Sequence, residues 1–214
     1  MSLSPAACLL PLLALPPATA WRDQPGKDGV IARTAPSGSG APWGYAEGEI
    51  NAPPAAVLAH LTDFAHLVGR VPRLREARVV EPATVDAEGL MSAVVYFDYD
   101  LPWPLSDRDY TVRYRWAPEA FDGAPAGSEG WRIVVEDAEY LGPPASKSAV
   151  RVRGIRGEWR VAPVKDAYHT LLRYTLLADF GGSLPQSVRD QTAWRQPMET
   201  IIGVRKSVES RAGK

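Results

Sequence analysis

The stretch 101-LPWPLSDRDY-110, which continues directly into 111-TVRYRW-116, decides the fold class of this chain. Two prolines restrict its first half to loop conformations. From Arg108 to Trp116 the side chains alternate, so that one face is mainly apolar and aromatic and the other is polar. This period of two predicts a strand from Arg108 to Trp116 whose apolar face must be covered by another layer of structure.

The same alternation recurs on both sides of this stretch and predicts an antiparallel meander. The connections are short and rich in Gly, Pro and Asp, whereas parallel strands would need longer crossovers between them. The further predicted strands are residues 43–50, 75–82, 91–101, 131–137, 149–154, 157–162 and 169–178.

Two short helices and one long helix complete the predicted elements. A proline pair precedes the first helix, over residues 55–62, and a second helical turn covers residues 65–70. Ser183 can cap a long C-terminal helix, which we expect Pro197 to kink or restart. Because this helix is the only large element left to cover the sheet, its apolar face should pack there; that face carries Trp194, Met198, Ile201 and Val208.

Composition and charge exclude several classes of function. The chain has 24 Lys and Arg against 25 Asp and Glu, so its charge favours no nucleic-acid partner. The single cysteine, Cys8, excludes a disulfide framework, and the three histidines lack a paired metal-binding spacing. No Gly-x-Ser-x-Gly motif indicates a serine hydrolase. We therefore expect a monomeric single domain without a metal or a cofactor.

The N-terminal 20 residues have the pattern of a secretory signal peptide. A short apolar core over residues 6–17 ends in Ala18-Thr19-Ala20, and the sequence then changes sharply to Trp21-Arg22-Asp23. The core is too short and too rich in proline for a membrane span. We expect residues 1–20 to be removed on export, so that the mature protein is periplasmic or secreted. Residues 21–42, rich in Gly, Pro and Ser, predict a linker with one edge strand.

At this point the chain resembles the START (lipid-transfer) domain family within the Bet v 1-like, or SRPBCC, superfamily. The segment Leu101 to Tyr110 matches the family's Pro-aromatic-Pro-Leu-Ser-x-Arg-Asp-Tyr motif at nearly every position. Weaker likeness lies at Ala52-Pro53, at Pro72 to Val80 and at Gly181 to Pro185. The resemblance implies an α+β helix-grip fold over residues 43–210. In this fold a curved antiparallel sheet wraps around a long C-terminal helix, with two short helices after the first strand.

Arg108 is the charged residue that alternation places on the otherwise apolar face. A buried guanidinium is costly unless it is paired. One interpretation is a fixed donor fork for the phosphate, carboxylate or carbonyl of a ligand. The other is an ion pair with Asp63, Asp98 or Asp107 that holds the start of the strand. Asp109 points to the other face, where we expect it to meet water and to act in structure.

Further inner-face residues are candidates for the wall of a ligand cavity. Each can also be plain core, and a cavity fold raises the chance that it contacts ligand. On the strand at residues 91–101, alternation does not show whether Tyr96 and Asp98 or Phe97 and Tyr99 point inward. The arginines at 151, 153, 156 and 160 predict a solvated strand face. The candidates for ligand binding are Arg108, Tyr110, Tyr114, Trp131, Trp159, Tyr174, Met198 and Ile201.

The resemblance implies a non-enzymatic carrier that binds a lipid or other hydrophobic small molecule in an internal cavity. It would carry, transfer or sense that ligand and would contact a membrane transiently. The same superfamily contains polyketide cyclases and aromatases, so an enzyme that uses the same cavity is the alternative. The sequence singles out no catalytic residue.

Overall fold

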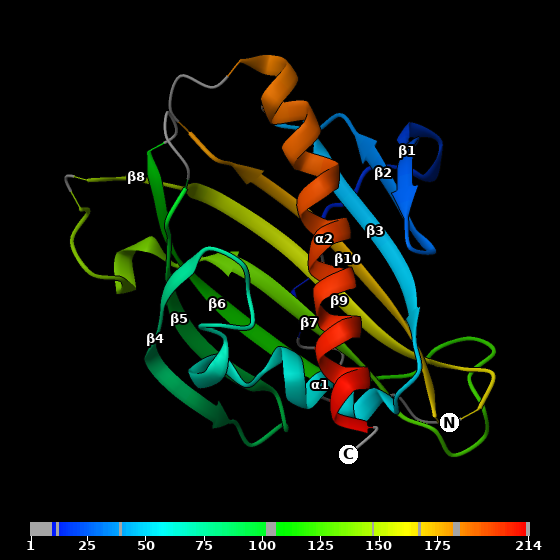
Figure 1. Cartoon of the computed structure of the whole chain (residues 1–214). Helices are drawn as coiled ribbons and strands as arrows, with labels where there is room; N and C mark the ends of the chain where they lie inside the picture. The colour runs from blue at the N-terminus through cyan, green and yellow to red at the C-terminus, as the bar shows by residue number, and fades with distance from the viewer. Residues whose placement is uncertain are drawn as a thin grey trace.

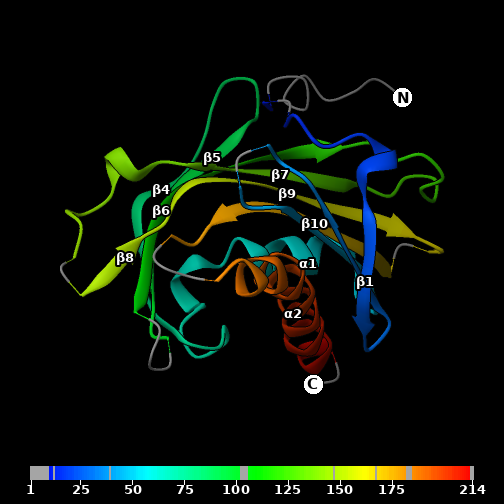
Figure 2. The same cartoon turned by 90° about the horizontal axis from the view of Figure 1, so that it is seen from above.

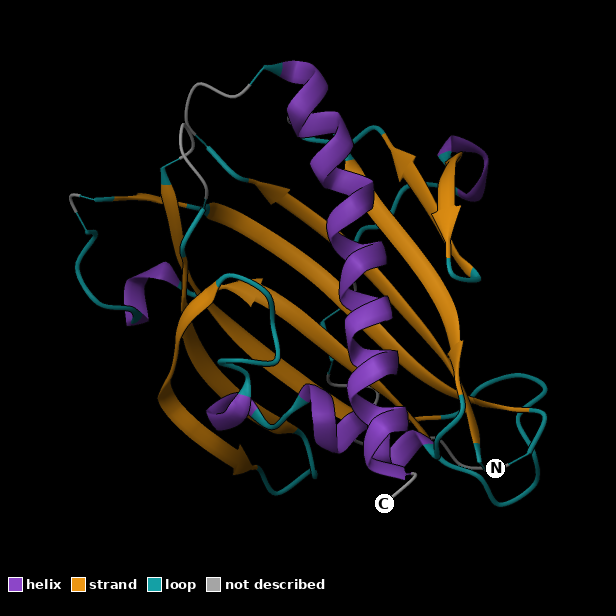
Figure 3. Cartoon of the chain, in the orientation of Figure 1, coloured by secondary structure: helices purple, strands orange, loops and turns teal. Residues whose placement is uncertain are grey.

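One highly curved sheet dominates the computed structural model, which describes residues 10–11, 13–38, 40–101, 106–146, 148–166, 168–181 and 185–212 (Figures 1 and 3). Its strand order is β1-β2-β3-β10-β9-β7-β6-β5-β4, and β8 pairs with β6 outside this path. The strands are β1 (Arg22–Lys27), β2 (Val30–Ala35), β3 (Trp43–Ile50), β4 (Leu74–Val85), β5 (Met91–Tyr99), β6 (Asp107–Glu119), β7 (Gly130–Asp137), β8 (Ala149–Arg151), β9 (Arg153–Val164) and β10 (His169–Asp179).

Five helical segments accompany the strands in the described part of the chain. They are η2 (Ala18–Ala20), α1 (Pro54–Leu61), η3 (Phe64–His66), η4 (Glu139–Leu141) and α2 (Gln186–Ala212). Together the elements confirm the predicted α+β class, with a curved, mainly antiparallel sheet and a long C-terminal helix. None of the helices in the described residues is long and apolar enough to cross a membrane.

Two parts of the sheet differ from the sequence-based expectation. The segment expected to be a linker with one edge strand holds two strands, β1 and β2, which pair with each other and extend the sheet beyond β3. β8 pairs with the start of β6 in parallel, so the sheet is not a pure meander. Its partner lies far away in sequence, and no local alternation could have indicated that pairing.

Both α1 and α2 lie on the same face of the sheet, which we call the inner face (Figure 2). α2 runs across β3 because that strand presents almost no side chain to it. A Cβ atom on Gly44 would lie 1.7 Å from the carbonyl oxygen of Ala193 in α2. A Cβ on Gly48 would lie 2.7 Å from Arg205 Nη2, also in α2. The helix therefore packs directly against the backbone of β3.

Pro197 lies inside α2, which is continuous from Gln186 to Ala212 and is not restarted there. Proline has no N–H to pair with the carbonyl four residues earlier, which is that of Ala193. That carbonyl oxygen is the atom that faces Gly44. The predicted apolar face of the helix is confirmed, because Met198, Ile201 and Val208 are buried in the core.

The other end of the inner face is covered by shorter elements. α1 packs against β7, β9, β10 and α2, and η3 packs against β4. Val57 of α1 and Phe64 of η3 belong to the main core, together with Phe97, Ile133 and Leu172 of the sheet. The described residues before β1 lie on the outer face, where Leu10 packs against Ala117 and Val134. Of the predicted signal peptide, residues 1–9 and 12 lie outside the described residues, as does Cys8.

Candidate functional site

Four tyrosines from three strands meet on the inner face, and we call them the tyrosine cluster: Tyr99 on β5, Tyr110 and Tyr114 on β6, and Tyr174 on β10. The rings of Tyr99 and Tyr110 stack with their centroids 5.8 Å apart. Phe97 joins the two tyrosines of β6, at 5.2 Å from Tyr110 and 6.4 Å from Tyr114. The pairing of Phe97 with Tyr110 across β5 and β6 places these rings side by side.

Tyr174 approaches the cluster from the far side of β9. Its ring stacks on Trp159, with centroids 3.6 Å apart and an interplanar angle of 3°. Gly157 is the next inward residue of β9, and a Cβ atom there would contact the Tyr174 ring at 3.6 Å. The Tyr174 ring therefore lies over β9, where it stacks on Trp159 and lies beside Gly157, which has no side chain. Burial raises the pKa of the Tyr174 hydroxyl, and a hydrogen bond with Gln196 of α2 opposes this effect in part.

The four hydroxyls are electrostatically coupled and stay protonated at neutral pH. Burial raises the pKa of Tyr110 well above its usual value, and the phenols of Tyr99 and Tyr114 raise it further because ionising one disfavours ionising another. Burial also raises the pKa values of Tyr99, Tyr114 and Tyr174. Each hydroxyl is thus a permanent hydrogen-bond donor that carries no charge.

These hydroxyls have few partners within the protein. The Tyr110 hydroxyl donates to that of Tyr99 over a long 3.4 Å. In the described part of the chain, the Tyr114 hydroxyl has no hydrogen-bond partner, and the side-chain oxygen Oε1 of Gln196 is buried without one. Tyr99, Tyr110 and Tyr114 nevertheless keep part of their accessible surface. The cluster therefore combines apolar ring faces with unused hydrogen-bonding capacity.

Arg108 is buried, but it forms none of the ion pairs considered from the sequence. Its Nε donates to the carbonyl of Phe180 at 2.6 Å, and Nη2 donates to that of Gly181 at 3.4 Å. Nη1 donates to the carbonyls of Ser106 and Asp107. Burial lowers the pKa of this guanidinium, and the charge of Asp107 only partly opposes the effect. Arg108 therefore ties the start of β6 to the chain that follows β10.

The carboxylates expected near Arg108 pair elsewhere. Asp63 pairs with His66 and Arg70, and both Asp98 and Asp107 pair with Arg75. Of the motif over residues 101–110, residues 102–105 lie outside the described part of the chain, as do residues 182–184 before α2.

Asp109 corrects a prediction, because it faces outward but is fully buried. It accepts two hydrogen bonds of 2.8 Å from Arg151 of β8 and one of 3.2 Å from the Tyr96 hydroxyl. Since Tyr96 points outward, Phe97 and Tyr99 are the residues of β5 that point inward. The expected solvated arginine face is wrong for Arg151, whose side chain is only 6% exposed.

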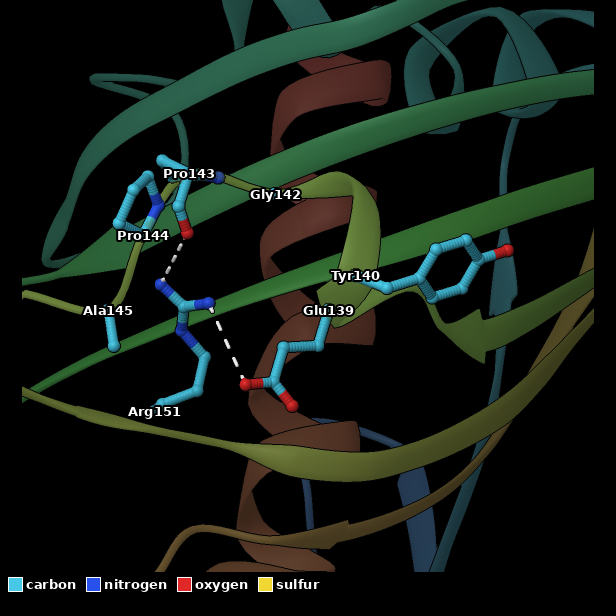
Figure 4. Close-up of a pocket in the computed structure, with 7 residues that line it drawn as sticks. All are labelled: Glu139, Tyr140, Gly142, Pro143, Pro144, Ala145 and Arg151. Atoms are coloured by element: carbon cyan, nitrogen blue, oxygen red, sulfur yellow. Dashed lines mark hydrogen bonds and ion pairs between the residues drawn. The ribbon is translucent and has the colours of Figure 1, made fainter.

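A shallow hollow beside Arg151 lies on the outer face of the sheet (Figure 4). Its guanidinium also donates to the carbonyl of Pro143 at 3.1 Å and lies 4.0 Å from Glu139. Asp109 accepts from Nε and Nη2, and Glu139 faces Nη1, so carboxylates already balance the charge of Arg151 in the hollow. We call the contacts of Arg151 with Asp109, Pro143 and Glu139 the outer brace, and we interpret them as holding the loop after β7 against the outer face of the sheet. The described residues contain no group of three metal-binding side chains.

The structure brings together only some of the residues predicted to line a cavity. Tyr110, Tyr114 and Tyr174 belong to the tyrosine cluster, and Trp159 stacks on it. Trp131 lies opposite Val161, one inward position further along the sheet, and makes no ring contact with the cluster. Met198 and Ile201 are buried in the core, and Ile201 lies against Gly48 of β3. Whether any of them contacts a ligand stays a prediction.

Three residues of the site were not predicted from the sequence. Tyr99 and Phe97 were left undecided because both faces of β5 carry aromatic side chains. Gln196 was missed because one polar residue on a helix gives no pattern. Because Phe97 is opposite Tyr110, the register of β5 and β6 would have shown which face of β5 points inward, but that register depends on the fold.

Comparisons with known proteins were made by sequence and by structure. No model of a known protein family matches the sequence. An uncharacterized protein of Pseudomonas aeruginosa is 29% identical over 119 residues, which are 56% of this chain and 54% of that protein. The match thus spans about half the length of this relative.

Solved structures match almost the whole chain. The STAR-related lipid transfer protein of Xanthomonas axonopodis has a TM-score of 0.73 at 22% identity, covering 89% of this chain and 99% of that one. Human StAR-related lipid transfer protein 5 has a TM-score of 0.74 at 15% identity, covering 92% and 89%. The Zhui aromatase/cyclase of Streptomyces sp. R1128 has a TM-score of 0.51 at 18% identity, covering 79% and 94%.

Proposed function

Because the chain has the fold of STAR-related lipid-transfer (START) domains, we propose that it binds a hydrophobic small molecule between the inner face of the sheet and α2. The observation that carries the proposal is the accessible surface kept by Tyr99, Tyr110 and Tyr114. Rings that pack against protein on every side lose that surface. We infer that an apolar ligand occupies space beside these inner-face residues.

Carriage is the role that this arrangement supports best. Each CH₂ group that leaves water contributes about 0.8 kcal/mol, so an apolar interior binds such molecules without catalytic groups. Two structures of the same fold carry lipid transfer in their names, which supports the same class of ligand here. Release at a membrane would follow if part of the cover over the inner face moves aside.

Uptake of N-phenyl-1-naphthylamine, an uncharged dye that fluoresces in apolar surroundings, tests this proposal. We expect saturable binding at one site per chain. Ala77 of β4 is opposite Phe97 and is partly accessible, so Ala77→Trp should fill the space and weaken uptake. Val85→Trp is the matched control, because Val85 is 67% exposed at the end of the same strand. No dye binding by the folded protein, or equal loss in both variants, would contradict the proposal.

Transfer between vesicles separates carriage from simple binding. Donor vesicles with a fluorescent lipid, mixed with unlabelled acceptors, should exchange it faster in the presence of the protein. Ala77→Trp should slow this exchange, and Val85→Trp should leave it unchanged. Native mass spectrometry of protein from a lipid-containing host should then give the mass of the ligand. Binding without transfer would favour a sensor.

Export of the mature chain from residue 21 also belongs to the proposal. It rests on the apolar core and the Ala18-Thr19-Ala20 triplet, which have the pattern that signal peptidases cleave. N-terminal sequencing of protein recovered from a periplasmic extract should begin at Trp21. An intact N-terminus in the cytoplasm would reject this part and leave ligand binding untouched.

A cyclase or aromatase activity is the second candidate function. It is favoured by the four protonated phenols, which can donate hydrogen bonds to the carbonyl groups of a reactive chain. A solved aromatase/cyclase shares the fold at a TM-score of 0.51. Turnover of a polyketone substrate that falls on Tyr110→Phe would favour this function over carriage.

A further inference from the structure

We propose that the tyrosine cluster, with Gln196, selects an uncharged ligand that carries a hydroxyl or carbonyl group on a flat ring body, in preference to one with an anionic head group. This inference rests on the proposed function and names the ligand class for the same site. It follows from where charge is placed in the fold, from the unused hydrogen-bonding capacity, and from the ring faces.

The charged groups of the interior are already committed. In the described residues, the charged side chains that are buried or nearly so are Arg108, Asp109, Arg132, Arg151 and Glu158. Arg132 and Glu158 pair with each other at 2.6 Å, and Asp109 pairs with Arg151 at 2.8 Å on the outer face. Arg108 donates from all three of its nitrogens to backbone carbonyls. Among the described residues, Arg108 is therefore not free to neutralise a phosphate or a carboxylate, and Arg205, whose Nε has no partner, lies over Gly48 of β3.

An anion would pay a large desolvation cost in such a site. Transfer of an ionised carboxylate into a low-dielectric interior is strongly unfavourable unless a cation or several donors compensate it. To bind an anion, Arg108 would have to release the carbonyls of Phe180 and Gly181, which would lose their donor. An uncharged ligand requires no such exchange.

The neutral groups at the site offer both donors and an acceptor. The Tyr114 hydroxyl has no partner in the described residues, and the 3.4 Å bond from Tyr110 to Tyr99 is weak enough to be replaced. The side-chain oxygen Oε1 of Gln196 is buried without a donor in the described residues, which is costly until a ligand supplies one. A ligand hydroxyl can accept from a phenol and donate to Gln196, and a ligand carbonyl can accept from two phenols.

The ring faces favour a flat ligand. The Tyr99–Tyr110 stack and the Trp159–Tyr174 stack come from opposite sides of the cluster. Aromatic rings pack best in offset-stacked or edge-to-face geometry, so planar or fused rings match such walls. A flexible acyl chain gains burial there but cannot use the hydroxyls along its length.

A matched series of naphthalenes tests the selectivity on the full-length protein. N-phenyl-1-naphthylamine is bound first and is then displaced by 2-naphthol, 2-acetonaphthone, naphthalene or 2-naphthoate at pH 7. These compounds share one ring body and differ only in a hydroxyl, a carbonyl, no polar group or an anion. We expect 2-naphthol and 2-acetonaphthone to displace the dye at concentrations about tenfold lower than 2-naphthoate.

Two single-atom substitutions locate the effect. Tyr114→Phe and Tyr110→Phe should each weaken 2-naphthol by about threefold to tenfold, the effect of one hydrogen bond, and leave naphthalene unchanged. Tyr168→Phe is the control, because Tyr168 is 70% exposed and lies outside the cluster. Gln196→Leu should weaken 2-naphthol, a donor, more than 2-acetonaphthone, which only accepts.

The outcomes separate this inference from the proposed function. If the dye does not bind to the wild-type protein, the proposed function fails. If the dye binds but 2-naphthoate displaces it as well as 2-naphthol does, the proposed function stands and the selectivity is overturned. If Tyr114→Phe and Tyr168→Phe give equal affinities for 2-naphthol, the assignment to the cluster is overturned.

Discussion

The two halves of the inner face differ in what lies against them. Over β3, Gly44, Ala46 and Gly48 present almost no side chain, and α2 packs against the strand backbone. Over β5 and β6, Phe97, Tyr110 and Tyr114 project inward, and the two tyrosines keep accessible surface. The long helix thus docks where the side chains are smallest. The half with the largest side chains is covered in part by η3 instead, whose Phe64 ring lies 4.7 Å from that of Tyr114, because a straight helix cannot follow the curve of the whole sheet.

Loss of the close approach at β3 should have the largest effect. Gly44→Val would place a Cβ atom 1.7 Å from the Ala193 carbonyl oxygen, a backbone atom that cannot move without moving α2. We expect the free energy of unfolding to fall by roughly 5 kcal/mol, the upper end for single substitutions. Urea denaturation followed by tryptophan fluorescence measures it.

The matched control for this helix is Gly203→Ala. Gly203 lies within α2, and a Cβ atom there would meet nothing within 4 Å. Alanine should therefore stabilise the helix by about 0.5–1 kcal/mol. A mild effect of Gly44→Val would show that α2 does not pack on β3 as described.

Loss of the ion pair between Arg151 and Asp109, on the outer face of β6, should have the next largest effect. Arg151→Met would leave Asp109, which is fully buried, without its cation. We expect a loss of about 3–5 kcal/mol. The double variant Arg151→Met/Asp109→Leu should recover much of it, because it removes both charges. If the double variant recovers stability but still takes up little dye, the ion pair also positions the tyrosine cluster.

Acid pH should destabilise the packing of α1 against β7, β9 and β10 through His60. This imidazole is 7% exposed, and its Nδ1 has no partner in the described residues. Burial lowers its pKa first, Arg211 and Arg70 lower it further, and Asp63 opposes them in part. The unfolded chain binds a proton near pH 6.5, above the pKa in the folded protein, so stability should fall as the pH drops below about 6.5.

His60→Gln tests this source of acid sensitivity. The variant and the wild type are compared by thermal denaturation at pH 7 and pH 5. The wild type should lose more stability than the variant between the two pH values. Equal losses would mean that His60 stays unprotonated or finds an acceptor at low pH.

Removal of the Tyr99 hydroxyl from the tyrosine cluster should have the smallest effect on folding. Tyr99→Phe deletes only the long hydrogen bond with Tyr110 and keeps the ring stack. We expect a change of about 0.5 kcal/mol or less in the free energy of unfolding. A loss above about 2 kcal/mol would show that the cluster serves to stabilise the core.

Much of the fold was predictable because it depends on local patterns. The alternation at residues 43–50 places β3 at Trp43–Ile50, and the spacing of Met198, Ile201 and Val208 gives the buried face of α2. β1 and β2 were not distinguished, because Gly and Pro in residues 22–42 resemble a linker. The strand predicted over residues 149–154 contains β8, but its parallel pairing was not predicted, because its partner is distant in sequence.

The site was only half predictable for the same reason. Alternation gave the inward direction of Tyr110, Tyr114 and Tyr174. It also put Asp109 on the outer face and implied contact with water, but residues 138–146 and β8 cover that face and bury the carboxylate. Arg108 was correctly expected to be buried, yet its partners are carbonyls that no charge pattern reveals.

The sequence by itself determined which residues point to which face of each strand, since side-chain direction follows from the backbone period of two. It also determined the long apolar helix and the aromatic character of β6. Only the tertiary structure decided that α2 lies on β3, that Tyr99 and Gln196 lie at the tyrosine cluster, and that Arg108 donates its hydrogen bonds to backbone carbonyls. Those facts depend on register and sheet curvature, which bring together residues as distant in sequence as Gly44 and Ala193 and leave no periodic trace in the chain.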